Sequence, residues 1–125
     1  MSIFKELGLS QEVADSLKEL GYEQPTEIQK ISIPQILGSK DDLKAFAQTG
    51  TGKTAAFLVT VITRLLAMPE KSSGLPSAII VAPTRELSRQ IYEEAKIIAR
   101  HTGLSLAQVV GGVDYLKQAE ILRRG

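Results

Sequence analysis

The segment from Ala47 to Thr54, with the sequence Ala-Gln-Thr-Gly-Thr-Gly-Lys-Thr, constrains this chain more than any other. It follows a short apolar run at 43–47 and precedes an amphipathic stretch that predicts a helix over 53–67. Gly50 and Gly52 allow the backbone to turn, so that successive N–H groups point inward at the positive end of the following helix. The pattern therefore predicts a loop that holds the phosphates of a nucleotide.

Two side chains at the end of this loop are the ones we assign to chemistry. Lys53 is expected to place its ammonium on the outer phosphates, and the Thr54 hydroxyl to bind the Mg²⁺ ion that bridges them. The strict form of the motif begins with glycine and this chain has Ala47, so the match is to a relaxed pattern; a flexible glycine turn before a helix is the alternative. The other residues assigned to the phosphates are Gln48, Thr49, Gly50, Thr51 and Gly52.

The alternation of apolar runs and helical patterns predicts an α/β fold of three layers, with helices on a parallel sheet, as in P-loop NTPases. The expected strands are 43–47, 78–82 and 104–110, and the helices that follow them are 53–67, 85–101 and 114–124. A sheet of this class usually has about five or six strands, so we expect a domain that is incomplete at its C-terminal side.

A helical region is expected before the sheet, which divides the chain into residues 1–37 and 38–125. Ser10 can cap a first helix that ends near Leu20, with Gly21 at its stop. A second helix is expected from Thr26 to Leu37, kinked or shortened by Pro34.

Composition limits the remaining classes. A 43% share of hydrophobic residues in 125 residues supports one core and excludes two full domains. The absence of cysteine excludes disulfides and thiolate metal sites, and no apolar run approaches the roughly 18 residues of a membrane span. We therefore expect a soluble, cytoplasmic protein. A net charge of +1 gives no overall attraction for nucleic acid, so any such contact must come from local arrangement.

Groups that could read a base lie upstream of the loop. Tyr22 offers a ring, Phe4 a second one, and the Gln29 amide can accept from the adenine amino group while donating to the adjacent ring nitrogen. Taken alone, Thr26 and Gln29 also have the spacing of a helix capping box, and Tyr22 fits a core position.

The order and spacing of these segments resemble the DEAD-box RNA helicases, specifically the front part of their first RecA-like motor domain. The segments that carry the resemblance are Phe4, Gly21–Gln29, Ala47–Thr54, Pro83–Leu87 and Gly111–Gly112. The resemblance implies that Phe4 and Tyr22 flank adenine and that Gln29 reads it. It implies ATP and Mg²⁺ as ligands and RNA as a partner.

The resemblance also assigns RNA contacts: Pro83, Thr84 and Arg85 to the RNA backbone, and the amides of Gly111 and Gly112 to an RNA phosphate. From the residues alone, Thr84 is a natural helix cap and the helix start an anion site, whereas two glycines at a strand end are also ordinary turn chemistry. Three further bases on the same helix, at Arg89, Lys96 and Arg100, fit a solvated face as well as a phosphate track.

The family's Asp-Glu-Ala-Asp tetrad, its Ser-Ala-Thr motif and its second motor domain are not in this sequence. Those parts supply the chemistry of phosphoryl transfer. We therefore expect the chain alone to bind nucleotide weakly and to lack hydrolysis and unwinding. Three alternatives stay open: another P-loop ATPase or a kinase, a DNA translocase of related fold, and a module that holds ATP without hydrolysing it.

Overall fold

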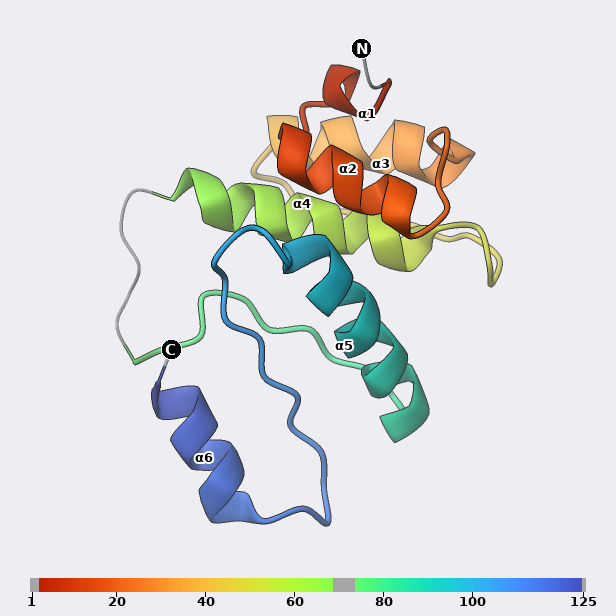
Figure 1. Cartoon of the computed structure of the whole chain (residues 1–125). Helices are drawn as coiled ribbons and strands as arrows, with labels where there is room; N and C mark the ends of the chain where they lie inside the picture. Colours follow the sequence, from red (N-terminus) through yellow and green to blue (C-terminus); the bar gives the residue numbers. More distant parts are fainter. Residues whose placement is uncertain (1–2, 69–73, 125) are drawn as a thin grey trace.

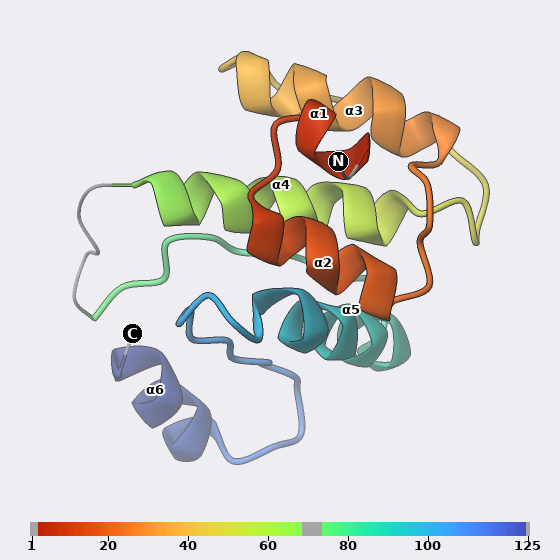
Figure 2. The ribbon, with the colours of Figure 1, turned by 45° about the horizontal axis from the view of Figure 1, so that its top comes forward.

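The computed structural model describes residues 3–68 and 74–124, and the described residues contain six helices (Figure 1). These are α1 (Ile3–Glu6), α2 (Gln11–Glu19), α3 (Glu27–Gly38), α4 (Lys53–Ala67), α5 (Arg85–Ala99) and α6 (Tyr115–Arg123). Figures 1 and 2 show α4 between the N-terminal helices and α5, with α6 set apart near the C-terminus. Two long extended segments lead into and out of α5.

The first predicted helix is confirmed as α2. The Ser10 hydroxyl accepts a hydrogen bond from the Val13 N–H at 3.4 Å, which caps the start of the helix. Its end is marked by Leu20 and then Gly21, which adopts a left-handed φ of 90° that a residue with a side chain rarely takes. Residue chemistry alone was enough to place both ends.

The second predicted helix is confirmed as α3, but the expected shortening at Pro34 is wrong. The helix continues through Pro34 to Gly38. Proline removes one backbone donor, and Pro34 lies on the exposed face, where water can bind the carbonyl left without a helical partner. Packing of α3 along α4 supplies the rest of its stability.

One hydrophobic core joins the helices from α1 to α5. Its buried side chains are Phe4, Leu9, Val13, Ala14, Leu17, Ile33, Ala55, Ala56, Leu58, Val59, Ile62, Ile91, Ala95, Ile98 and Ala99. They come from both sides of residue 37, and the division of the chain at that point stays a prediction. No helix in the described ranges is both long and apolar enough to cross a membrane.

Helices α3 and α4 run parallel and are fastened at both ends. At their N-terminal ends, the Gln29 Nε2 donates to the Gly52 carbonyl at 3.2 Å. At their C-terminal ends, the Arg64 guanidinium donates to the carbonyls of Ile36 and Ser39, the latter at 2.5 Å. Because the two helices are parallel, residues 39–52 must run back along them from the end of α3. This return places the phosphate loop at the start of α4.

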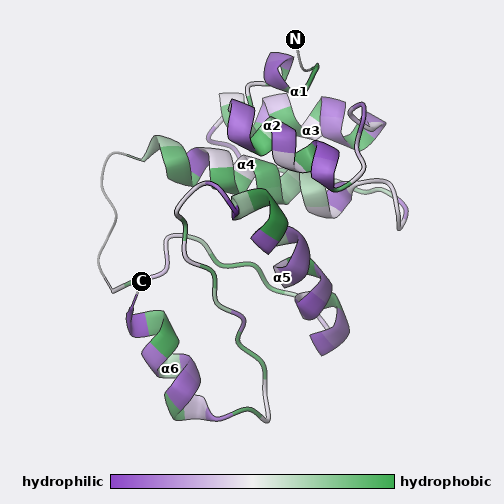
Figure 3. Cartoon of the chain, in the orientation of Figure 1, coloured by the Kyte–Doolittle hydropathy of each residue, from purple (hydrophilic) through white to green (hydrophobic). Residues whose placement is uncertain are grey.

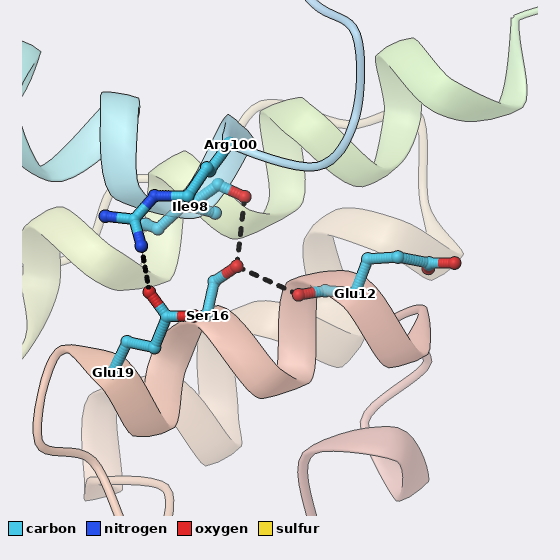
Figure 4. Close-up of polar contacts among 5 residues, drawn as sticks. All are labelled: Glu12, Ser16, Glu19, Ile98 and Arg100. Carbon is cyan, nitrogen blue, oxygen red and sulfur yellow. Dashed lines mark hydrogen bonds and ion pairs between the residues drawn. The ribbon is translucent and has the colours of Figure 1, made fainter.

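A buried hydroxyl ties α2 to α5 (Figure 4). The Ser16 Oγ lies 2.9 Å from the Glu12 carbonyl of its own helix and 3.2 Å from the Ile98 carbonyl near the end of α5. At the edge of this contact the Arg100 guanidinium pairs with the Glu19 carboxylate at 2.9 Å. This link between residues 82 positions apart was not predicted from the sequence.

The three predicted strands are not formed within the described residues. Segments 43–47, 78–82 and 104–110 are extended, yet no backbone hydrogen bond joins one to another in those ranges. A parallel strand exists only where a neighbouring strand completes its ladder of hydrogen bonds, and no such ladder joins these segments in the described residues. Figure 3 shows apolar residues along the segments on either side of α5, and Ile79 and Val81 there are 80% and 87% exposed.

Candidate functional site

The phosphate loop ends where α4 begins, with Gly52 at the N-cap. Gly50 and Gly52 both have left-handed φ values, 82° and 85°, and the Thr51 hydroxyl donates to the Gln48 carbonyl at 2.5 Å inside the turn. The first bond of the helix runs from the Ala56 N–H to the Gly52 carbonyl. The preceding N–H groups, from Lys53 to Ala55, therefore have no helical acceptor and form the positive end of α4.

The Gln29 side chain of α3 holds the end of this loop in place. Its side chain is fully buried; Nε2 donates to the Gly52 carbonyl, and Oε1 accepts from the Thr26 N–H at 3.1 Å. Thr26 and Gln29 have the arrangement of a capping box, in which the Gln29 backbone faces the Thr26 hydroxyl. The Thr26 Oγ1 is nevertheless buried and makes no hydrogen bond of normal geometry in the described residues. A side chain on Gly52 would overlap Gln29 Nε2, so only glycine fits.

The structure brings two of the three groups assigned to adenine next to the loop. Tyr22 lines the same cavity as Gly50, Gly52 and Lys53, and Gln29 contacts Gly52 directly. Phe4 is fully buried in the core under α2 and does not line that cavity. The capping role that the sequence offered for Gln29 is realised through its bond to Thr26, and its adenine role stays a prediction.

The cavity beside the loop has a volume of about 650 Å³ and a second wall that the sequence did not indicate. That wall is α5, from which Leu87, Gln90 and Glu94 face the loop residues Lys53 and Thr54. Glu94 lies at an ordinary helix position, so nothing in its sequence context marks it. Only the packing of α5 beside α4 brings it to the cavity.

The carboxyl group of Glu94 lies in an unusual environment for a side chain on a helix. Its Oε2 is buried and has no hydrogen-bond partner within the described ranges. Burial raises the pKa of Glu94, because the charged form loses its hydration. The pKa of Tyr22 is also raised, first by burial and then by the negative charge of Glu94. The two side chains therefore share one partly desolvated region of the cavity.

The residues assigned to RNA gather at the other end of α5. The Thr84 hydroxyl accepts from the Leu87 N–H at 3.1 Å and caps the helix, and Arg85 is its first residue. The Arg85 guanidinium lies against the turn at Gly111 and Gly112: its Nη2 is 2.9 Å from where a Cβ on Gly112 would be. Residues 26 positions apart thus form one exposed surface beside a helix N-terminus.

The other basic residues of α5 and its C-cap form ion pairs on the surface. Arg89 pairs with Glu86 and Lys96 with Glu93, each at 2.9 Å, while Arg100 pairs with Glu19 as described. Within the described residues Arg85 forms no ion pair. This contrast separates Arg85 from the solvated face that follows it.

Residues 26–125, which hold the loop, the start of α5 and the glycine turn, match the family model for the DEAD/DEAH box helicases. The chain belongs to this family. It is 42% identical to the ATP-dependent RNA helicase SrmB of Escherichia coli (strain K12) over 121 residues, which are 97% of this chain and 27% of SrmB. It is 46% identical to the ATP-dependent RNA helicase RhlB of Shewanella pealeana over 125 residues, 98% of this chain and 28% of RhlB.

Among solved structures, this DEAD/DEAH box chain is similar to the RNA helicase Prp28 of Chaetomium thermophilum bound to ADP. The TM-score is 0.82 at 40% identity, over 100% of this chain and 30% of that one. The fold similarity supports the RecA-like, P-loop class expected from the sequence, although strands are not formed in the described part of this chain. The chain spans less than a third of the length of these relatives.

Proposed function

We propose that this chain is the ATP-binding front part of the first motor domain of an ATP-dependent RNA helicase. The observation that carries the proposal is the loop from Gln48 to Thr54, which ends at the N-terminus of α4 and is fixed from below by Gln29. The relatives named above as ATP-dependent RNA helicases support the same function. A cytoplasmic location is part of this proposal.

In this proposal the phosphates of ATP lie against the unpaired N–H groups at the start of α4. Lys53 neutralises the outer phosphates, and Thr54 contributes its hydroxyl to Mg²⁺ together with phosphate oxygens. The described residues contain no cluster of three His, Cys, Asp or Glu side chains, so a metal ion here depends on the nucleotide for most of its ligands. Mg²⁺ binding in this chain should therefore require ATP.

The adenine end is proposed to lie beside Tyr22 and Gln29. Gln29 has one amide hydrogen and one oxygen lone pair beyond the two bonds it makes to the protein, so these bonds need not break for a base to be read. Its side chain is fully buried, so a base reaches it only after the groups that cover it move aside. Stacking by Phe4, which the family resemblance implied, would require its fully buried ring to leave the core. Tyr22 is therefore the ring that we favour.

The RNA backbone is proposed to lie on the surface formed by Thr84, Arg85, Gly111 and Gly112. Pro83, also exposed, ends the extended segment beside it. The guanidinium, the start of α5 and the turn amides all favour a phosphate at one place. Hydrolysis and unwinding are proposed for the longer relatives rather than for these residues alone. The acidic residue that helps to hold Mg²⁺ and the arginines that neutralise the transition state are not in this sequence.

The nucleotide proposal is tested by titrating the folded chain with fluorescent ATP and GTP analogues in the presence of Mg²⁺. Lys53→Ala should weaken ATP binding at least about tenfold, since it removes a charge from the phosphates. Lys40→Ala, an exposed lysine outside the loop, should leave the affinity unchanged. Equal affinity of the wild type and the Lys53→Ala variant would rule out the phosphate loop as the site.

The RNA proposal is tested by binding single-stranded RNA, and DNA of the same sequence, at several salt concentrations. Arg85→Ala should weaken RNA binding and lower the slope of log K against log salt by about 0.7, the value for one phosphate contact on a single strand. Arg89→Ala removes the same charge from an ion-paired position four residues along and should change the slope less. Equal binding of RNA and DNA would favour the translocase alternative.

A further inference from the structure

The turn at Gly111 and Gly112 is closed by one side chain from α6. Gln118 Oε1 accepts a hydrogen bond from the Val110 N–H at 2.8 Å, and its Nε2 lies 3.5 Å from the Val113 carbonyl. These two backbone groups stand immediately before and after the two glycines. A single amide side chain therefore bridges the base of the turn, as a backbone pair would in a hairpin.

The turn is also held from the side of α5. The Gln108 Nε2 donates to the Ser88 hydroxyl at 3.0 Å, which fixes the segment that leads into the turn. Gly112 has a φ of 78°, and a side chain there would overlap the Arg85 guanidinium. The two glycines thus lie between Arg85 and Gln118, and both are exposed. Within the described residues, the Gly111 and Gly112 N–H groups donate to no protein acceptor.

Helix α6 makes little contact with the rest of the chain apart from Gln118. No residue of α6 is buried, and Asp114 already caps the helix by accepting from the N–H groups of Leu116 and Lys117. Gln118 itself is half-buried, while Tyr115 and Leu116 on the first turn are 79% and 77% exposed. The contact of Gln118 with the turn is the polar link between α6 and the surface that carries Arg85.

We propose that Gln118 is a positioning residue for an RNA backbone phosphate. By bridging Val110 and Val113, it keeps the amides of Gly111 and Gly112 unpaired and beside Arg85, so that one phosphate can meet both. The inference rests on the RNA-binding role proposed above and adds to it a residue that does not touch RNA. A glutamine that merely stabilised α6 would give a different result in the experiment below.

The test compares Gln118→Met, which keeps the length and removes both hydrogen bonds, with Gln118→Ala, which favours the helix. Gln35→Ala, an exposed glutamine on α3, is the matched control. Affinities for a fluorescein-labelled oligouridylate are measured at several salt concentrations, and affinities for ATP in parallel. We expect both Gln118 variants to bind RNA about five- to tenfold more weakly, as loss of one or two hydrogen bonds implies, with a shallower salt slope. ATP binding and the control should be unchanged.

Each other outcome overturns the proposal in a distinguishable way. Wild-type RNA affinity in Gln118→Met would remove the role of Gln118 while leaving the RNA site intact. An equal loss of RNA and ATP affinity, with a lower melting temperature, would show that Gln118 only stabilises the fold. A wild-type chain that binds no RNA would overturn both this proposal and the RNA-binding function on which it rests. NMR signals of Gly111 and Gly112 that do not move in Gln118→Met would show that the turn does not depend on it.

Discussion

Two phenylalanines show the difference between the helical core of this molecule and its extended segments. Phe4 is fully buried under α2, whereas Phe46, in the extended segment before the phosphate loop, is 90% exposed. The same contrast separates the apolar face of α4 from Ile79 and Val81, which are exposed on the segment that leads to α5. Helices find their hydrogen bonds within themselves and need only one another to cover their apolar faces, whereas strands also need neighbours for their backbone.

The difference teaches that the phosphate loop depends on helices rather than on the sheet. The segment before the loop is extended and forms no strand hydrogen bonds. The loop ends in the first turn of α4, and the Gln29 side chain of α3 bonds to it. The proposed nucleotide site can therefore keep its geometry while the extended segments remain uncovered. The predictions below challenge this comparison, beginning with the largest expected effect.

The largest difference is expected between substitutions of the two phenylalanines. Phe4→Ala should lower the free energy of unfolding by about 3 to 5 kcal/mol, because it leaves a cavity in the helical core. Phe46→Ala should change it by less than about 0.5 kcal/mol, because its ring is already in water. Urea denaturation followed by circular dichroism measures both. Similar losses from the two substitutions would show that the extended segments are part of the cooperative core.

The two loop glycines sharpen the same comparison at the site. Gly50→Ala and Gly52→Ala both impose a left-handed φ on alanine, at a cost of about 1 to 2 kcal/mol each. Gly52→Ala should lose more stability, because its methyl group overlaps Gln29 Nε2, whereas the space beside Gly50 is open. Thermal melts of the single variants, and of Gly52→Ala combined with Gln29→Ala, test this. Strict additivity in the double variant would contradict a direct contact.

A smaller effect is expected where α2 meets α5. Ser16→Ala leaves the buried Ile98 carbonyl without its donor and should lower the unfolding free energy by about 1 to 2 kcal/mol. Thr60→Val is the control, because the buried Thr60 hydroxyl bonds only within its own helix. Amide exchange near the end of α5 should accelerate in the first variant alone. Equal acceleration in both would mean that the cross-helix bond adds nothing.

The smallest expected effect is a pH dependence from Glu94. Burial raises its pKa above the ordinary value of 4.5, so the folded chain holds its proton more tightly than the unfolded chain does. The contribution of Glu94 to stability is therefore greatest at low pH and is lost as pH rises from about 4.5 through the raised pKa. Glu94→Gln should flatten this part of the stability profile, and Glu93→Gln, an exposed neighbour, should not. Identical profiles for the wild type and Glu94→Gln would contradict the burial.

Local chemistry made much of this structure predictable. The predicted range of α4 agrees with the structure, and the caps at Ser10, Thr84 and Asp114 lie where the sequence placed helix starts. The loop glycines have the left-handed φ that the motif requires. Each of these features depends on residues within one or two turns of one another. The family followed from the order of the motifs and is confirmed by the match over residues 26–125.

The failures concern which segments become neighbours. Apolar runs correctly marked extended segments, but a run of Ile and Val carries no information about the strand beside it, so the three predicted strands are unpaired. Glu94, Ser16 and Gln118 acquire their roles only through the packing of helices distant in sequence. Pro34 was misjudged because its exposure on α3, which makes it tolerable, is itself a product of packing.

The fastening of α3 and α4 at both ends has a consequence for how the chain is made. The hydrogen bonds that fasten the two helices join residues between Gln29 and Arg64. All of these residues precede α5 in the sequence and are synthesised before it. Synthesis proceeds at about 5 to 20 residues per second, which is slow compared with helix formation. The loop at the start of α4 would thus take its shape while the segments around α5 have yet to emerge from the ribosome.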